Sequence, residues 1–141
     1  MNDTIRFMNN LFLVLILSIF SVHLHSQEVF KVGELEMTFE STSIDLGEVK
    51  KGETREFEYK FMNTGTIPIR IDIVSGCDCT TTDWPRKPID PGDEATISVI
   101  FDSTEKEDSE TVDVDIYLLN EDPNTGGPIL KIVNYSFDLV N

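Results

Sequence analysis

Histidine is almost absent from this sequence. The chain has 141 residues and two histidines, His23 and His25, which both lie within the first 26 residues. Ser-His and Cys-His nucleophiles, histidine-ligated zinc and imidazole acid-base catalysis all require this side chain. From residue 27 onward these classes of site are therefore excluded. Carboxylate, lysine or tyrosine chemistry remains, but no recognisable motif indicates it, so we predict that the protein is not an enzyme and needs no cofactor.

Basic residues are also scarce. The chain contains 11 Lys and Arg against 26 Asp and Glu, which gives a formal net charge of −15. Removing the first 26 residues removes Asp3 and Arg6, so 25 acidic and 10 basic side chains remain and the charge is unchanged. Nucleic acids and anionic membranes are bound through clusters of Lys and Arg. The composition excludes both partners and favours a soluble surface, with attraction to cations or to a basic partner as the alternative.

No apolar run is long enough to cross a bilayer. The longest, Leu11–Val22, has 12 residues, which reach about 18 Å as a helix against a hydrocarbon core of about 30 Å. Arg6 precedes this run and Ser26-Gln27 follows it, which is the layout of a secretory signal peptide. We predict a signal peptide over residues 1–26 and a periplasmic or secreted protein with no membrane insertion after cleavage. An uncleaved N-terminal anchor is the alternative.

Sustained helical periodicity is missing from residue 37 onward. Apolar and charged residues instead alternate, as in Arg55–Met62, and turn residues such as Asn63-Thr64-Gly65 separate the runs. This pattern is typical of strands with one buried face. We predict an all-β, immunoglobulin-like sandwich of two antiparallel sheets and about seven strands over residues 37–141. Residues 27–36 are expected to form a flexible N-terminal segment.

Three details of this sandwich can be predicted from the same pattern. Met37–Glu40 and Ser43–Leu46 are expected to form one edge strand in two pieces, and Ile67 to Ile73 should alternate along the strand that follows the turn. The proline-rich stretch from Cys77 to Pro91 is expected to be a long connection with few regular hydrogen bonds. The residues expected in the core are Phe57, Tyr59, Phe61, Ile69, Ile71, Val99, Phe101, Val114 and Ile116.

The two cysteines, Cys77 and Cys79, are the feature most able to carry chemistry. In an extended strand, residues two apart have Cα atoms about 6.6 Å apart, so a disulfide would require a local turn, which Gly76 could supply. We expect a structural role, as a small-ring disulfide or as two packed thiols. The alternative is a metal-binding or thiol-redox protein. Two thiolates do not complete a tetrahedral site, however, and Asp78 beside both sulfurs disfavours their thiolate forms.

Two further sites are weaker candidates. Trp84-Pro85 is a possible binding surface, because an exposed indole stacks well on sugars or proline. The alternative is that Trp84 caps one end of the sandwich and covers the cysteine pair. Asp113 and Asp115 could hold calcium, but the calcium-loop pattern with its internal glycine is missing, so calcium binding is not expected and no metal site is predicted.

Seven short phrases occur in a fixed order between Phe39 and Tyr117. They are Phe39, Ile44-Asp45-Leu46-Gly47 followed by Lys51-Gly52, Phe61-Met62-Asn63-Thr64-Gly65, Cys77-Asp78-Cys79-Thr80, Trp84-Pro85, Ile89-Asp90-Pro91-Gly92 and Val99-Ile100-Phe101-Asp102. In this order they resemble a bacterial family known as domain of unknown function 1573, related to the abnormal-spindle and Hydin type of immunoglobulin-like domain. The resemblance implies a periplasmic or secreted β-sandwich and brings no established activity or ligand. We therefore expect a structural or protein-binding module of the cell envelope, whose partner is an unknown envelope protein.

Overall fold

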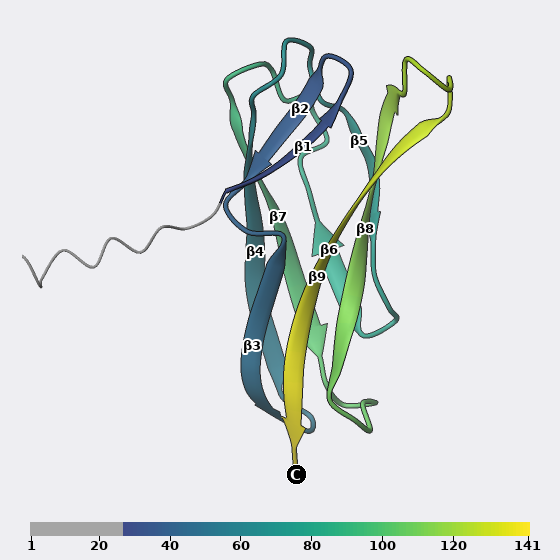
Figure 1. Ribbon diagram of the computed structural model, residues 1–141. Helices are drawn as coiled ribbons and strands as arrows, with labels where there is room; N and C mark the ends of the chain where they lie inside the picture. Colours follow the sequence, from purple (N-terminus) through teal and green to yellow (C-terminus); the bar gives the residue numbers. More distant parts are fainter. Residues whose placement is uncertain (1–26) are drawn as a thin grey trace, which may run out of the picture.

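The computed structural model describes residues 27–141, which form an all-β domain (Figure 1). This part of the chain contains no helix, and therefore none long and apolar enough to cross a membrane. The predicted all-β class is confirmed, whereas the predicted signal peptide over residues 1–26 lies outside the described residues. The nine strands are β1 (Glu28–Val32), β2 (Leu35–Phe39), β3 (Ser43–Lys50), β4 (Thr54–Asn63), β5 (Ile71–Ser75), β6 (Thr80–Asp83), β7 (Glu94–Asp102), β8 (Glu110–Glu121) and β9 (Pro128–Val140).

Two sheets face each other and enclose one core (Figure 1). The five-stranded sheet has the order β1-β2-β4-β7-β6 and the four-stranded sheet has the order β3-β9-β8-β5. This arrangement confirms the immunoglobulin-like sandwich, although it has nine strands where about seven were expected. All strand pairs are antiparallel except β3 with β9, which is parallel.

The predicted inward faces are confirmed for most core positions. Eight of the nine expected residues are buried, and Phe57 is partly buried against the core. Aromatic rings fill the space between the sheets: the centroids of Phe39 and Phe61 lie 5.2 Å apart, and those of Phe101 and Phe137 lie 4.5 Å apart. The alternation in β4 and β7 thus places every second side chain against the opposite sheet.

The N-terminal segment differs from the expectation of flexibility over residues 27–36. It forms β1 and the first residues of β2, which pair as an antiparallel hairpin. Phe30 and Val32 pack against the core from β1, and Leu35 is buried at the start of β2. These apolar side chains give the short segment enough buried surface to join the sheet as its edge strand.

The residues expected to form one interrupted edge strand belong to two different sheets. β2 lies inside the five-stranded sheet, between β1 and β4, while β3 is the edge of the four-stranded sheet. The chain crosses between the sheets after Phe39, and β3 then runs parallel to β9. β3 also continues beyond Gly47, where the register shifts between Asp45 and Glu48 and the glycine adopts a φ of 64°.

A bulge overturns the expected alternation between Ile67 and Ile73. The register between β5 and β8 shifts between Ile71 and Ile73, so that Ile73 faces outward and Val74 is buried in its place. A bulge inserts one residue into a strand and moves the residues after it to the other face. β5 also begins later than the pattern predicts, at Ile71, because Ile69 bridges to Ile89 instead.

The connection from Cys77 to Pro91 contains more regular structure than expected. Its residues Thr80–Asp83 form β6, which pairs with β7. Ile89 makes an isolated bridge with Ile69 in which each backbone N–H donates to the other residue's carbonyl at 2.9 Å. The Thr-Thr-Thr-Asp sequence of β6 has no apolar alternation, so the periodicity could not reveal this strand.

Candidate functional site

The two cysteines form a disulfide in a tight turn between β5 and β6. Their Cα atoms lie 5.1 Å apart, within the range of disulfides and shorter than the spacing in an extended strand. The backbone N–H of Thr80 donates to the carbonyl of Cys77 at 2.9 Å and closes the turn. The disulfide thus constrains the turn by which the chain passes from β5, an edge strand of one sheet, to β6, an edge strand of the other.

Gly76 contributes to this turn through its small size. Its φ lies outside the left-handed region, but a Cβ atom at this position would lie 3.0 Å from the Cβ of Thr80. That distance is tighter than most Cβ contacts. The glycine therefore lets the chain pass close to the first residue of β6.

A buried hydroxyl network surrounds the disulfide. The Tyr135 and Thr80 hydroxyls lie 2.7 Å apart, and the Tyr135 hydroxyl lies 3.7 Å from the Sγ atom of Cys79. Burial raises the pKa of Tyr135, and the hydrogen bond with Thr80 opposes this shift. No cysteine of the described chain is free. The pair therefore presents no thiolate for metal binding or nucleophilic attack in this state.

The exposed side of the disulfide is acidic. A shallow hollow beside Cys79 is lined by Asp78, Asp102, Thr104 and Glu105. Hydrogen bonds from the Thr104 hydroxyl and backbone N–H hold the pKa of Asp102 below its usual value. Carboxylates beside the sulfurs disfavour thiolate formation. Within residues 27–141, no three His, Cys, Asp or Glu side chains are grouped to hold a metal ion.

Trp84 follows the last residue of β6, whereas Cys79 precedes the first. At the rise of a strand, the five intervening steps correspond to about 16 Å of backbone, and β6 separates the two positions along the chain. Its ring packs against the core. The guanidinium carbon of Arg86 lies 3.6 Å from the ring centroid, a cation–π contact that occupies one face of the indole.

The indole N–H of Trp84 is buried and has no hydrogen-bond partner among residues 27–141. Pro85 beside it is partly exposed. Arg86 stacks on one face of the ring, so a ligand that stacks on that face must displace Arg86. The binding surface at Trp84 and Pro85 stays a prediction.

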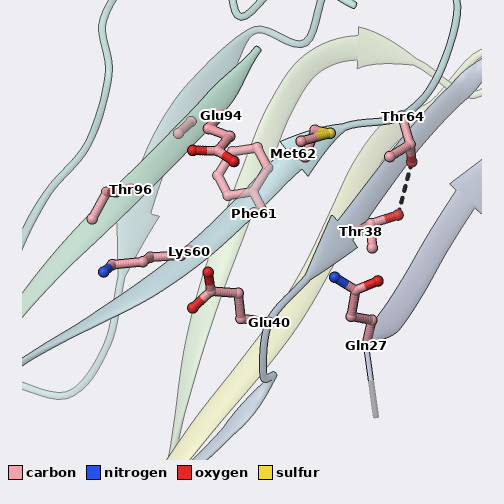
Figure 2. A pocket seen from close by; sticks show the side chains of 10 residues that line it. Gln27, Thr38, Glu40, Lys60, Phe61, Met62, Thr64, Glu94 and Thr96 are labelled. Carbon is pink, nitrogen blue, oxygen red and sulfur yellow. Dashed lines mark hydrogen bonds between the residues drawn. The ribbon is translucent and has the colours of Figure 1, made fainter. Parts of the chain in front are cut away.

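A small depression lies on the outer face of the five-stranded sheet (Figure 2). It has a volume of about 170 Å³, and its lining includes Glu40 just after β2, Lys60 and Met62 of β4 and Glu94 of β7. The Thr38 and Thr64 hydroxyls lie 2.8 Å apart at one end of it. The depression offers carboxylates, an ammonium and a thioether on a nearly flat sheet, and it contains no nucleophile paired with a base.

Exposed apolar side chains gather on the outer face of the four-stranded sheet. We call this group the β5–β8–β9 patch. Four of its members, Leu119, Ile73, Ile132 and Leu130, have exposed fractions of 59, 46, 44 and 40%. Tyr117 completes it, because it pairs with Ile73 on one side and with Leu130 on the other. Large apolar side chains grouped on a surface mark interaction sites in soluble proteins.

The sequence reasoning missed this patch. The expected core included Val114 and Ile116 of β8, and no expectation was made for the outer faces of β8 and β9. The signal was present in the sequence, because Leu130 and Ile132 lie between the buried Ile129 and Val133 and make this part of β9 apolar on both faces. A strand that is apolar on both faces is typical of burial on both sides.

The chain matches a family model described as "Protein of unknown function (DUF1573)" over residues 37–129. This match confirms the family resemblance of the seven phrases. No curated protein matches the chain.

Solved structures share the fold at low sequence identity. A protein of unknown function from Porphyromonas gingivalis W83 matches with 23% identity and a TM-score of 0.58, over 86% of this chain and 51% of that one. The VesB protease of Vibrio cholerae matches with 11% identity and a TM-score of 0.57, over 75% of this chain and 32% of that one. The chain thus spans only about a third to a half of the length of these two proteins.

A human domain matches over nearly its whole length. The ASH/PapD-like domain 7 of human CEP192 has 14% identity and a TM-score of 0.52, over 84% of this chain and 98% of that one. At these identities the likeness shows a common fold.

Proposed function

Since the chain belongs to the DUF1573 family, whose function is unknown, we propose from its own surface that it is a non-enzymatic, exported module that binds another protein of the cell envelope. The β5–β8–β9 patch is the observation that carries this proposal. An immunoglobulin-like sandwich presents flat sheet faces, and this chain leaves one of them apolar toward the end where β8 turns into β9. Apolar side chains grouped on an exposed face gain free energy when a partner removes them from water.

The absence of enzymatic activity belongs to the same proposal. The disulfide turn, the acidic hollow beside it and the depression on the five-stranded sheet lack an acid-base pair in contact with a nucleophile, which hydrolytic chemistry would require. The protease activity named for VesB belongs to a protein of which this chain matches 32%. We therefore assign this chain the binding role alone.

The alternative of a metal-binding or thiol-redox protein has no specific observation in its favour. Both sulfurs are joined in the disulfide, and the hollow beside it is lined by carboxylates. A soft metal ion would require free thiolates and further nitrogen or sulfur ligands.

Export can be tested by sequencing the N-terminus of the protein recovered from its native cells. We expect the mature chain to begin near Gln27 and to be found in the periplasm or the medium. Intact Met1 in the membrane fraction would contradict release as a soluble protein and support the anchor.

Binding can be tested by photocrosslinking in intact cells. A photoreactive amino acid is placed at Leu119 in the patch, and separately at Val29 on the outer face of the other sheet, as a control of similar exposure. We expect one dominant crosslinked envelope protein from at least one site. If the folded protein gives no crosslinked partner at either position, the binding role is wrong.

A further inference from the structure

We propose that the β5–β8–β9 patch binds an amphipathic helix of the partner protein, and that Lys or Arg side chains flank the apolar stripe of that helix. This inference rests on the proposed protein-binding function and names the surface and the chemistry of the partner.

The dimensions of the patch match one helix. Ile73, Tyr117 and Leu130 form a row across β5, β8 and β9. Leu119 lies two residues further along β8, and Ile132 lies two residues along β9 on the other side of the row, opposite Asp115. With about 4.8 Å between strands and about 3.3 Å per residue, the patch is about 10 Å wide and about 13 Å long. A helix about 10 Å in diameter covers this area with about nine residues.

The centre of the patch is held in place by a side-chain hydrogen bond. The Tyr117 hydroxyl donates to Asp115 Oδ2 at 3.4 Å, within the same outer face. The ring of Tyr117 therefore stays on the sheet, between Ile73 and Leu130. A preformed apolar surface of this kind loses little side-chain freedom when a partner binds.

The charges around the patch determine which helix fits. Asp72 adjoins Ile73 at the bulge, and Asp113 and Asp115 continue the outer face along β8. Arg70 lies just before β5, and its carbonyl accepts the Leu119 N–H at 2.8 Å. It is therefore a cation beside the patch. Carboxylates thus predominate around the patch, and the whole chain carries a net charge of −15. Charge complementarity favours a partner with Lys or Arg beside its apolar stripe.

The same charges disfavour a second copy of this chain as the occupant. Two patches facing each other would bring Asp72, Asp113 and Asp115 of both copies together. Like charges brought together at an interface cost several kcal/mol and suppress the wrong partner. The surface is therefore better suited to a basic partner than to itself.

The neighbouring sheet edge is closed, which favours docking on the face over addition of a strand. β5 is the edge strand beside the patch. The Thr82 hydroxyl donates to the carbonyl of Val74 at 2.8 Å and occupies an acceptor on this edge. The disulfide turn then ends the strand after Ser75. Short and covered edges are how proteins prevent strand addition.

Designed helical peptides test the proposal with the protein as it exists. The probe is a helix-stapled peptide of about 18 residues with a Leu stripe flanked by Lys, and its matched analogue carries Glu in place of every Lys. Binding is followed by fluorescence anisotropy at about 0.15 M salt, where long-range charge effects are screened. We expect the Lys peptide to bind at least about tenfold more tightly than the Glu peptide.

Two matched double variants show where the peptide binds. Leu119→Ser/Ile132→Ser removes two exposed apolar side chains from the patch and should weaken binding of the Lys peptide at least about tenfold. Val29→Ser/Ile100→Ser removes two exposed apolar side chains from the outer face of the other sheet without changing the charge, and should leave the affinity within about twofold. Thermal unfolding confirms that each variant is folded. If the patch variant is unfolded, Asp72→Asn/Asp115→Asn replaces it. This variant removes two negative charges beside the patch and should also weaken binding of the Lys peptide.

Three results would overturn the proposal. Equal affinity of both double variants would show that net charge alone attracts the peptide. Tighter binding of the Glu peptide would show that the partner has the opposite chemistry. A concentration-dependent dimer in sedimentation velocity, lost in the patch variant, would show that a second copy covers the patch.

The failure of this inference is distinguishable from the failure of the proposed function. An envelope protein crosslinked at Val29 and not at Leu119 would retain the binding role and reject the patch. Specific binding of the Lys peptide with no crosslinked envelope partner would retain the surface chemistry and reject the role.

Discussion

The side-chain amide of Asn63 donates a hydrogen bond of 2.8 Å to the backbone carbonyl of Ile89, 26 residues further along the chain. The same amide donates to the carbonyl of Ile67 at 2.9 Å, and its Oδ1 atom accepts the Gly65 N–H at 3.0 Å. Asn63 itself is fully buried. One side chain thus holds the turn after β4 against the segment that precedes β7.

Replacing Asn63 with Ala should destabilise the fold strongly. The substitution leaves the carbonyls of Ile67 and Ile89 without this donor in a buried environment, and we expect a loss of about 2 to 4 kcal/mol in the free energy of unfolding. Urea denaturation measures it. Asn124→Ala, at an exposed turn position, is the control and should change the stability by less than about 0.5 kcal/mol. Equal effects of the two variants would show that the Asn63 contacts do not matter.

Phe61 tests the inward face of β4. It is 2% exposed, and its ring packs against Phe39. Phe61→Ala should therefore cost about 3 to 5 kcal/mol through lost burial and the resulting cavity. The exposed Ile100→Ala, measured in the same reversible melt, should cost less than about 1 kcal/mol. A loss below about 1 kcal/mol for Phe61→Ala would show that Phe61 is not on the core face of β4.

Two buried tyrosines should respond differently to removal of their hydroxyls. The Tyr135 hydroxyl is paired with Thr80, whereas the Tyr59 hydroxyl has no partner among residues 27–141. Tyr135→Phe should cost about 1 kcal/mol, because it leaves the Thr80 hydroxyl without its partner. Tyr59→Phe should be neutral or should stabilise the fold by up to about 1 kcal/mol, since burying an unpaired hydroxyl is unfavourable. Denaturation of both variants under one condition checks the difference, and the reverse order would contradict it.

Alkaline pH should destabilise the protein through the same two residues. Burial raises the pKa of both Tyr59 and Tyr135, so the folded state keeps protons that the unfolded state releases above about pH 10. Stability is therefore fully retained below that pH and falls as the pH rises, by up to about 1.4 kcal/mol per pH unit for each tyrosine. Urea midpoints at about pH 9 and about pH 11 measure the slope. Tyr59→Phe should reduce the slope, and an unchanged slope would assign it to other groups.

The sequence predicted the strands whose side chains alternate regularly. β4, β7 and β8 follow the period of two because each has one face against the core, and the seven residues expected there, from Phe57 to Ile116, are all buried or partly buried. β6 could not be predicted, because Thr80–Asp83 has no apolar member and is held by pairing with β7. The bulge at Asp72 was equally hidden, since the isoleucines before and after it continue the same pattern in the sequence.

The candidate sites were predictable to different degrees. The need for a turn at Cys77 and Cys79 follows from covalent geometry, and the structure has that turn. The position of Trp84 could not be derived, because it depends on β6, which separates it from the cysteines. The β5–β8–β9 patch depends on which strands are neighbours: Ile73 and Leu130 are 57 positions apart in sequence and meet only on either side of Tyr117.

The disulfide should matter locally and modestly. It closes a ring of only three residues, for which the loop-entropy relation gives about 1.5 kcal/mol, against about 3 kcal/mol for a loop of fifteen residues. We expect Cys77→Ser/Cys79→Ser to keep the sandwich, to melt a few degrees lower and to retain binding of the Lys peptide at the patch, which lies on β5, β8 and β9 and includes neither cysteine.

The native protein should contain no titratable thiol under denaturing conditions and should have the mass of the oxidised chain, as expected for a protein exported to an oxidising compartment. Stoichiometric copper or zinc in the native protein, lost together with partner binding in the double variant, would instead support the metal-binding alternative.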